Sequence, residues 1–149
     1  MLFRSKSILD IPATLERLET FSVPILGFRT NNFPGFYLSN SGYNLEYRVE
    51  NVGEIADIWS QRSEVGIHKS GMVVANPVKN QMDKAQHDLL LAQGLERAEK
   101  EGIRGKEVTP FLLEFFHSQS NGESLRVNIE IIKENSALAA QIAVASQNR

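Results

Sequence analysis

Hydrophobic residues recur at helical spacing in five segments of the chain. In the first segment, Ile11, Leu15 and Leu18 fall on one face of a helix that we expect over about residues 11–21. The same kind of pattern predicts four further helices, over residues 51–64, 83–101, 109–119 and 124–146.

Residues typical of helix ends support these boundaries. Asp10 or Ile11 lies near the expected cap of the first helix, with Pro12 in its first turn. Asn51, followed by Glu54, resembles a capping box. Thr109 before a proline predicts an N-cap, with the proline at the first helical position.

Three short segments between the helices have the pattern of strands. The segments "VPILGF" (23–28) and "GMVVANP" (71–77) read as buried strands, and "LEYRVE" (45–50) alternates apolar and polar residues. Residues 29–44 have no helical period and read as a loop. Strands alternating with helices indicate one α/β domain over 1–149, layered α/β/α around a small, mixed sheet. So small a sheet would be completed by another segment or by oligomerisation.

Composition excludes several classes of protein. A net charge of -2 without a basic stripe argues against nucleic-acid binding. Without cysteine, neither a disulfide framework nor a thiolate site is possible. No apolar run approaches the roughly 20 residues that span a bilayer. We therefore expect a soluble, cytoplasmic chain that binds neither nucleic acid nor membranes.

Common catalytic signatures are missing from the sequence. It contains no nucleotide-binding glycine loop and no GxSxG motif. The three histidines, His68, His87 and His117, lie far apart and without a carboxylate at ligand spacing, so the sequence predicts no metal site for this chain.

Lys6 is a candidate nucleophile because it lies just before the first predicted helix. The partial positive charge of a helix N-terminus lowers the pKa of a nearby lysine, and its free N–H groups suit a phosphate. A neutral amine there can form a Schiff base with a sugar. The spacing alone favours the alternative that Lys6 is a solvated lysine on the surface.

Three other segments carry candidate binding residues. In the loop 30–37, aromatic side chains among asparagine and glycine would either stack on a ligand ring or fill the core through Phe33 and Phe36. Asn76 ends a buried strand, where α/β sheets bind ligands. Asn128 and Asn135 share one face of the last helix, either as hydrogen-bonded core groups or as ligand contacts.

Six ordered motifs resemble a known family. They are "KSILDIPATLERLE", "VPILGFRTNNFPGFY", "SGYNLEYRV", "GMVVANPV", "GIRGKEVTPFLL" and "GESLRVNIEIIKENSALAAQIAVA". Together, over about residues 5–145, they look like the C-terminal half of pseudouridine-5'-phosphate glycosidases, the family that includes indigoidine synthase A-like proteins.

The resemblance implies a reaction and its residues. Such enzymes reversibly cleave the C–C bond of pseudouridine 5'-phosphate to uracil and ribose 5-phosphate, and Lys6 occupies the place of their imine-forming lysine. The loop with Thr30, Asn32 and Phe33 would lie near the substrate, and Asn135 matches a family asparagine beside the pocket. The family's general acid glutamate and its manganese ligand lie before that lysine, outside this chain, and its loop tends to carry an acid where this chain has Asn31 and Asn32.

These departures leave three alternatives, the weakest of which is an independent Schiff-base enzyme on sugar phosphates. In the first, this is a glycosidase-like polypeptide with little or no activity as an isolated chain. In the second, it is a non-catalytic binding or assembly module, or a split subunit that pairs with a separate N-terminal half. In either case we expect a homo-oligomer.

Overall fold

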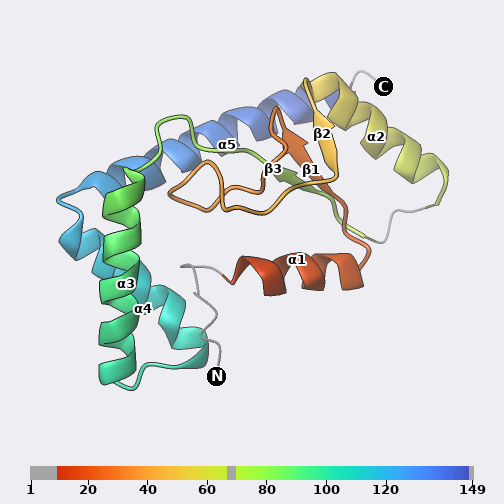
Figure 1. Ribbon diagram of the computed structural model, residues 1–149. Coiled ribbons are helices and arrows are strands. Elements are labelled where there is room, and N and C mark those ends of the chain that lie inside the picture. Colours follow the sequence, from red (N-terminus) through yellow and green to blue (C-terminus); the bar gives the residue numbers. More distant parts are fainter. Residues whose placement is uncertain (1–9, 67–69, 148–149) are drawn as a thin grey trace.

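The computed structural model describes residues 10–66 and 70–147 (Figure 1). Lys6 and His68 therefore lie outside the described residues. Along the chain, the elements are α1 (Ile11–Thr20), β1 (Ile25–Phe28), β2 (Tyr47–Val49), α2 (Val52–Glu64), β3 (Val73–Ala75), α3 (Lys84–Lys100), a 3-10 turn η1 (Gly105–Glu107), α4 (Val108–Gln119) and α5 (Glu123–Gln147). The five predicted helices and three predicted strands are confirmed, with boundaries shifted by a few residues.

The three strands form a parallel sheet in the order β2-β1-β3. The expected α/β class is confirmed, but the expected mixed sheet is wrong for the described strands. Leu26 of β1 is in register with Tyr47 of β2 on one side and with Val74 of β3 on the other. Each connection returns the chain to the same end of the sheet, through a long loop after β1 and through α2 after β2, so the strands run in one direction.

The ends of the helices agree with the sequence in two cases and differ in one. The Asp10 carboxylate accepts a hydrogen bond from the Ala13 N–H, and Asn51 Oδ1 accepts one from the Glu54 N–H at 3.1 Å. Thr109 is not an N-cap, because η1 leads directly into α4 and Glu107 occupies the cap position. Pro110 is tolerated in the first turn of α4, because an N–H group at that position has no partner within the helix.

Two hydrophobic clusters hold these elements together. The larger lies among α3, α4 and the start of α5 and includes Met82, Phe116 and Val127, all fully buried. The smaller lies between the sheet and α2, with Leu26, Val49 and Ile55 at its centre and Ile142 of α5 packed against it. Figure 1 shows why α5 reaches both, since it runs along the molecule from α3 and α4 to α2.

Candidate functional site at the carboxyl ends of the strands

Two of the segments singled out in the sequence meet at one edge of the sheet. Because β1 and β3 are parallel and Gly27 pairs with Ala75, the residues after both strands emerge side by side. Thr30 follows β1 and Asn76 follows β3 at this edge. The carboxyl ends of parallel strands are where open α/β sheets bind their ligands.

Asn76 and Asn135 are joined across this edge by a hydrogen bond. Asn76 Nδ2 donates to Asn135 Oδ1 at 3.0 Å, which links the end of β3 to the middle of α5. Asn135 is an exposed side chain rather than a core group. Because its oxygen accepts from Asn76, the Nδ2 group of Asn135 keeps two N–H donors that bond to no other described residue. The pair is therefore fixed in the orientation that offers donors to a ligand oxygen.

The turn after β1 is tight and is held by backbone contacts. A Cβ atom at Gly27 would lie 2.1 Å from the Thr30 carbonyl oxygen, so no other residue fits there without moving the turn. Arg29 adopts a positive φ of 57°, which reverses the chain direction directly after the strand. The Thr30 hydroxyl accepts from the Asn32 N–H at 3.0 Å and donates to the Asn32 carbonyl at 3.2 Å. Thr30 and Asn32 thus form one rigid turn.

The aromatic residues of the loop are divided between the core and the surface. Tyr37 is 3% exposed and stacks on Phe116 at 5.4 Å between ring centroids, with Phe36 packed beside it. Burial raises the pKa of the Tyr37 hydroxyl, and a hydrogen bond with Ser124 offsets part of that rise. Phe33 is half-buried, and its backbone bonds to Tyr43 and Ser41. The core-filling alternative is therefore correct for Phe36, while Phe33 stays a candidate contact.

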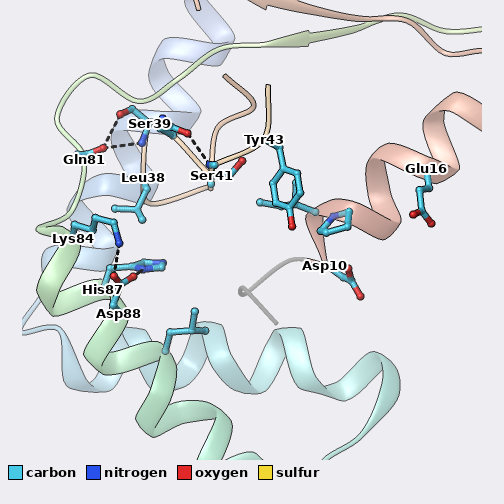
Figure 2. Close-up of a pocket in the computed structure, with 16 residues that line it drawn as sticks. Asp10, Glu16, Leu38, Ser39, Ser41, Tyr43, Gln81, Lys84, His87 and Asp88 are labelled. Carbon is cyan, nitrogen blue, oxygen red and sulfur yellow. Dashed lines mark hydrogen bonds and ion pairs between the residues drawn. The ribbon is translucent and has the colours of Figure 1, made fainter. Parts of the chain in front are cut away.

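A broad cleft lies beside this loop, between α1 and α3 (Figure 2). Its volume is about 1020 Å³. Figure 2 shows Lys84, His87 and Asp88 of α3 on one side, with Asp10 and Glu16 from the start of α1 on the other. The remaining polar residues that line it are Ser39, Asn40, Ser41, Tyr43 and Gln81. Both Ser39 N–H and Ser39 Oγ donate to Gln81 Oε1, at 2.9 and 2.7 Å, so the loop is tied to the start of α3.

The charged groups on the α3 side of the cleft are paired with one another. Lys84 Nζ donates to Asp88, whose other oxygen lies 3.1 Å from Nδ1 of the buried His87. The hydrogen bond from Lys84, followed by that from His87, holds the pKa of the Asp88 carboxyl below its usual range. The cleft thus offers hydroxyl and amide groups, a paired charged cluster on α3, and the carboxylates of Asp10 and Glu16 on the α1 side. Its composition was not predicted from the sequence, because its lining comes from segments far apart along the chain.

The site residues predicted from the sequence are only partly brought together. Thr30, Asn32 and Phe33 lie in one turn, and Asn135 is linked to Asn76, which ends the neighbouring strand. Lys6 lies outside the described residues. It precedes Asp10, which lines the cleft, by four positions in the sequence.

Neither a cluster of three metal-ligand side chains nor a membrane-spanning helix is found in the described residues. There, no three histidine, aspartate or glutamate side chains come together as metal ligands. Manganese stays a prediction of the family resemblance. Within the same ranges, no helix combines the length and apolarity needed to cross a membrane.

Comparison with known proteins identifies the family. A family described as "Indigoidine synthase A like protein" matches residues 4–145. The chain belongs to this family. It is 52% identical over 146 residues to a pseudouridine-5'-phosphate glycosidase of Salinispora tropica, and 41% identical over 143 residues to one of Staphylococcus aureus. These matches cover 97% and 95% of this chain but 45% and 46% of the relatives, so the chain spans about half of their length.

Solved structures agree with this assignment. An indigoidine synthase A-like protein from Thermotoga maritima is 41% identical, with a TM-score of 0.77 over 93% of this chain and 46% of that one. A prealnumycin C-glycosynthase, solved in complex with ribulose 5-phosphate, has a TM-score of 0.84 at 24% identity and covers 95% of this chain and 47% of its own. The second structure shows a shared fold.

Proposed function

We propose that this chain forms part of a pseudouridine-5'-phosphate glycosidase, which reversibly cleaves pseudouridine 5'-phosphate to uracil and ribose 5-phosphate. The observation that carries the proposal is the 52% identity to the Salinispora tropica glycosidase over 97% of the chain. The strand-end geometry supports it, because Thr30 and Asn76 emerge at one sheet edge and Asn76 orients Asn135.

In this proposal Lys6 is the nucleophile, an assignment that rests on the family motif. Its amine bonds to C1' of the ribose while the ring oxygen leaves and takes a proton. The C1'–C5 bond then breaks, giving the imine of ring-opened ribose 5-phosphate, and the electron pair passes to uracil C5, which is protonated. Water hydrolyses the imine and releases Lys6. The lone pair of the lysine nitrogen drives out the carbon leaving group as it forms the C=N bond of the imine.

The described residues would bind and orient the substrate. The free Nδ2 donors of Asn135 are suited to a hydroxyl, carbonyl or phosphate oxygen, and the half-buried ring of Phe33 is suited to packing against a pyrimidine. The rigid turn of Thr30 and Asn32 would fix the position of that ring. Manganese, if the whole enzyme uses it, would be held by residues outside the described part.

Borohydride trapping tests the nucleophile directly. Incubation of the chain with ribose 5-phosphate and borohydride, followed by peptide mass spectrometry, should give a reduced adduct at Lys6. The variant Lys6→Arg should give none, since a guanidinium forms no imine under these conditions. An adduct spread over the surface lysines, such as Lys79 and Lys133, would contradict the assignment.

A synthesis assay tests the activity of the isolated chain. With uracil, ribose 5-phosphate and manganese we expect little or no pseudouridine 5'-phosphate, because the general acid and metal ligands implied by the family are not among the described residues. Robust turnover would show that the chain carries a complete site. Binding without turnover or adduct would favour the alternative, a non-catalytic binding module.

A further inference from the structure

The connection between α4 and α5 contains Asn121–Gly122, the one asparagine–glycine sequence in the chain. Both residues are exposed, and both have a positive φ, of 52° and 84°. Glycine adopts such a backbone freely, and asparagine tolerates it better than most other residues do. The pair therefore forms a tight turn that faces solvent between two helices.

The groups that would react with each other in this turn have no other partner. Among the described residues, neither the Gly122 N–H nor the Asn121 side chain makes a hydrogen bond. A Cβ atom built on Gly122 would meet nothing within 4 Å, so the space beside this backbone is open. Most backbone N–H groups of a folded protein are bonded, and a bonded nitrogen is held away from reaction. The Gly122 nitrogen is not held in this way.

Asn40, which precedes a serine, shows the opposite arrangement. The Ser41 N–H donates to the Phe33 carbonyl at 3.0 Å, so the nitrogen next to Asn40 is engaged. Asn40 Oδ1 accepts from the Gly42 N–H at 2.7 Å, which fixes the amide as well. Both groups that would have to meet are therefore held apart by bonds to other atoms.

The second asparagine–serine pair, Asn135–Ser136, lies inside α5. In the interior of a helix the N–H of each residue bonds to a carbonyl one turn earlier, which engages the Ser136 nitrogen. The side-chain oxygen of Asn135 is bonded too, by Asn76. Of these three asparagines, only Asn121 is followed by a nitrogen without a bond to another described residue.

We propose that Asn121 is a site of spontaneous deamidation and isomerisation. The Gly122 nitrogen bonds to Cγ of Asn121, and the amide nitrogen of Asn121 takes up the displaced proton and leaves as ammonia. One water molecule then opens the resulting succinimide ring at either of its two carbonyls, which gives aspartate or isoaspartate. The reaction consumes water alone. The proposal does not rest on the glycosidase assignment.

The two products differ in their effect on the start of α5. The aspartate product leaves the backbone unchanged and places a negative charge just before the N-terminus of α5, where the helix dipole favours it. In the isoaspartate product the backbone passes through the side-chain carbons. The chain between Ser120 and Ser124 is then one carbon longer.

That segment is spanned by buried hydrogen bonds. Ser120 and Ser124 are 2% and 1% exposed, and Ser120 Oγ donates to Ser124 Oγ at 2.9 Å and accepts from the Ser124 N–H at 3.0 Å. Ser124 is also bonded to the side chain of Tyr37 in the larger core. An extra backbone carbon between the two serines disturbs these bonds, so isoaspartate destabilises the chain and aspartate does not.

Ageing of the folded chain at neutral pH and physiological temperature tests the site. Peptide mass spectrometry should show that Asn121 gains the mass difference between OH and NH₂ about ten-fold or more faster than Asn40 and Asn135, because only its neighbouring nitrogen is unbonded. An isoaspartate-specific carboxyl methyltransferase should label the aged chain. Asn121→Gln is the matched control and should remove the label, since the longer side chain closes its ring much more slowly.

Ser41→Gly separates the effect of the structure from that of the sequence. It gives Asn40 a glycine neighbour while leaving the backbone bond to Phe33 in place. In the folded variant Asn40 should still react about ten-fold or more slowly than Asn121, and in urea the two rates should agree within about two-fold, because the bonds are gone.

Stability measurements test the consequence. After separation of the aged products by ion exchange, the isoaspartate form should unfold at a lower urea concentration than the unmodified chain, and Asn121→Asp should not.

Three results would overturn the proposal. The first is an Asn121 that reacts no faster than Asn40 or Asn135 in the folded wild type. The second is equal reaction of Asn40 and Asn121 in folded Ser41→Gly, which would leave no role for the structure. The third is an isoaspartate form as stable as Asn121→Asp, which would show that the modification does not reach the buried serines.

Discussion

The helical region and the sheet region of this molecule are built differently. The helical region consists of α3, α4 and the first half of α5, and its core contains Val78, Met82, Leu90, Leu112, Phe116 and Val127 together with Tyr37 from the loop. The hydrophobic cluster of the sheet region is smaller and is centred on Leu26, Val49 and Ile55. The first packs largely with its own neighbours along the chain, whereas the second depends on segments far apart. The candidate site lies in the second.

The comparison shows where stability and ligand binding come from. The helical region supplies a dense core with a buried hydrogen bond between Ser120 and Ser124 at 2.9 Å. In the sheet region, the residues at the strand ends are fixed by the close approach of Gly27 to the Thr30 carbonyl and by polar pairs such as Asn76–Asn135. Substitutions in the first region should mainly change the free energy of unfolding. Substitutions in the second should also change ligand binding.

The largest expected effect is in the helical core. Phe116→Ala should lower the free energy of unfolding by about 3–5 kcal/mol, because Phe116 is fully buried and its removal leaves a cavity beside Tyr37. Urea denaturation measures this loss. Phe21→Ala, at a position 55% exposed, is the control and should stay within about 0.5 kcal/mol of the wild type. Equal losses would show that the helical core is not the main source of stability.

The second-largest loss of stability is expected at the turn after β1. Gly27→Ala should cost about 1–3 kcal/mol or more, since the new Cβ lies 2.1 Å from the Thr30 carbonyl oxygen and the turn has to move. It should also weaken binding of uracil or ribose 5-phosphate, measured by calorimetry. Gly71→Ala is a matched control, because no atom lies within 4 Å of its Cβ position and its φ is not positive. If Gly27→Ala behaved like this control, the tight turn would not matter.

A smaller effect is expected at the start of α2, which covers the sheet. Asn51→Ala should cost about 1 kcal/mol, because the Glu54 N–H loses its acceptor at the helix N-terminus. The change in the midpoint of urea unfolding gives this value. Gln61→Ala, at an exposed position inside the same helix, should change stability by less than about 0.5 kcal/mol. An unchanged midpoint for Asn51→Ala would show that the capping box contributes nothing.

The smallest effect concerns the charged pair on α3. Because Lys84 and then His87 hold the pKa of Asp88 below its unfolded value, the stabilisation is present above the unfolded pKa and is lost as the pH falls through the folded one. Asp88 is half-exposed, so the contribution is about 0.2–1 kcal/mol. Asp88→Asn should lower stability at pH 7 and flatten its decline in acid, and Lys84→Met should reproduce most of the loss. A wild-type pH profile in both variants would contradict this.

Local sequence patterns predicted the helical region well and the sheet region less well. The spacing of apolar residues located α3 and α5 to within a residue or two. The Thr109 cap was wrong because a 3-10 turn before α4, which no local signal marks, moved the start of the helix to Val108. The direction of the strands was also not predictable. The residues of a strand do not indicate which neighbour it pairs with, or whether the pairing is parallel or antiparallel.

The sequence by itself determined the five helices, the three strands, the family and the candidate residues Lys6, Thr30, Asn32, Phe33 and Asn135. These follow from periodicity and ordered motifs, which are local properties of the chain. Only the tertiary structure decided that the sheet is parallel, that Asn76 orients Asn135, and that Ile129 and Ile132 of α5 are exposed. Each of these depends on contacts between distant segments, and such contacts are fixed by the packing of the whole fold.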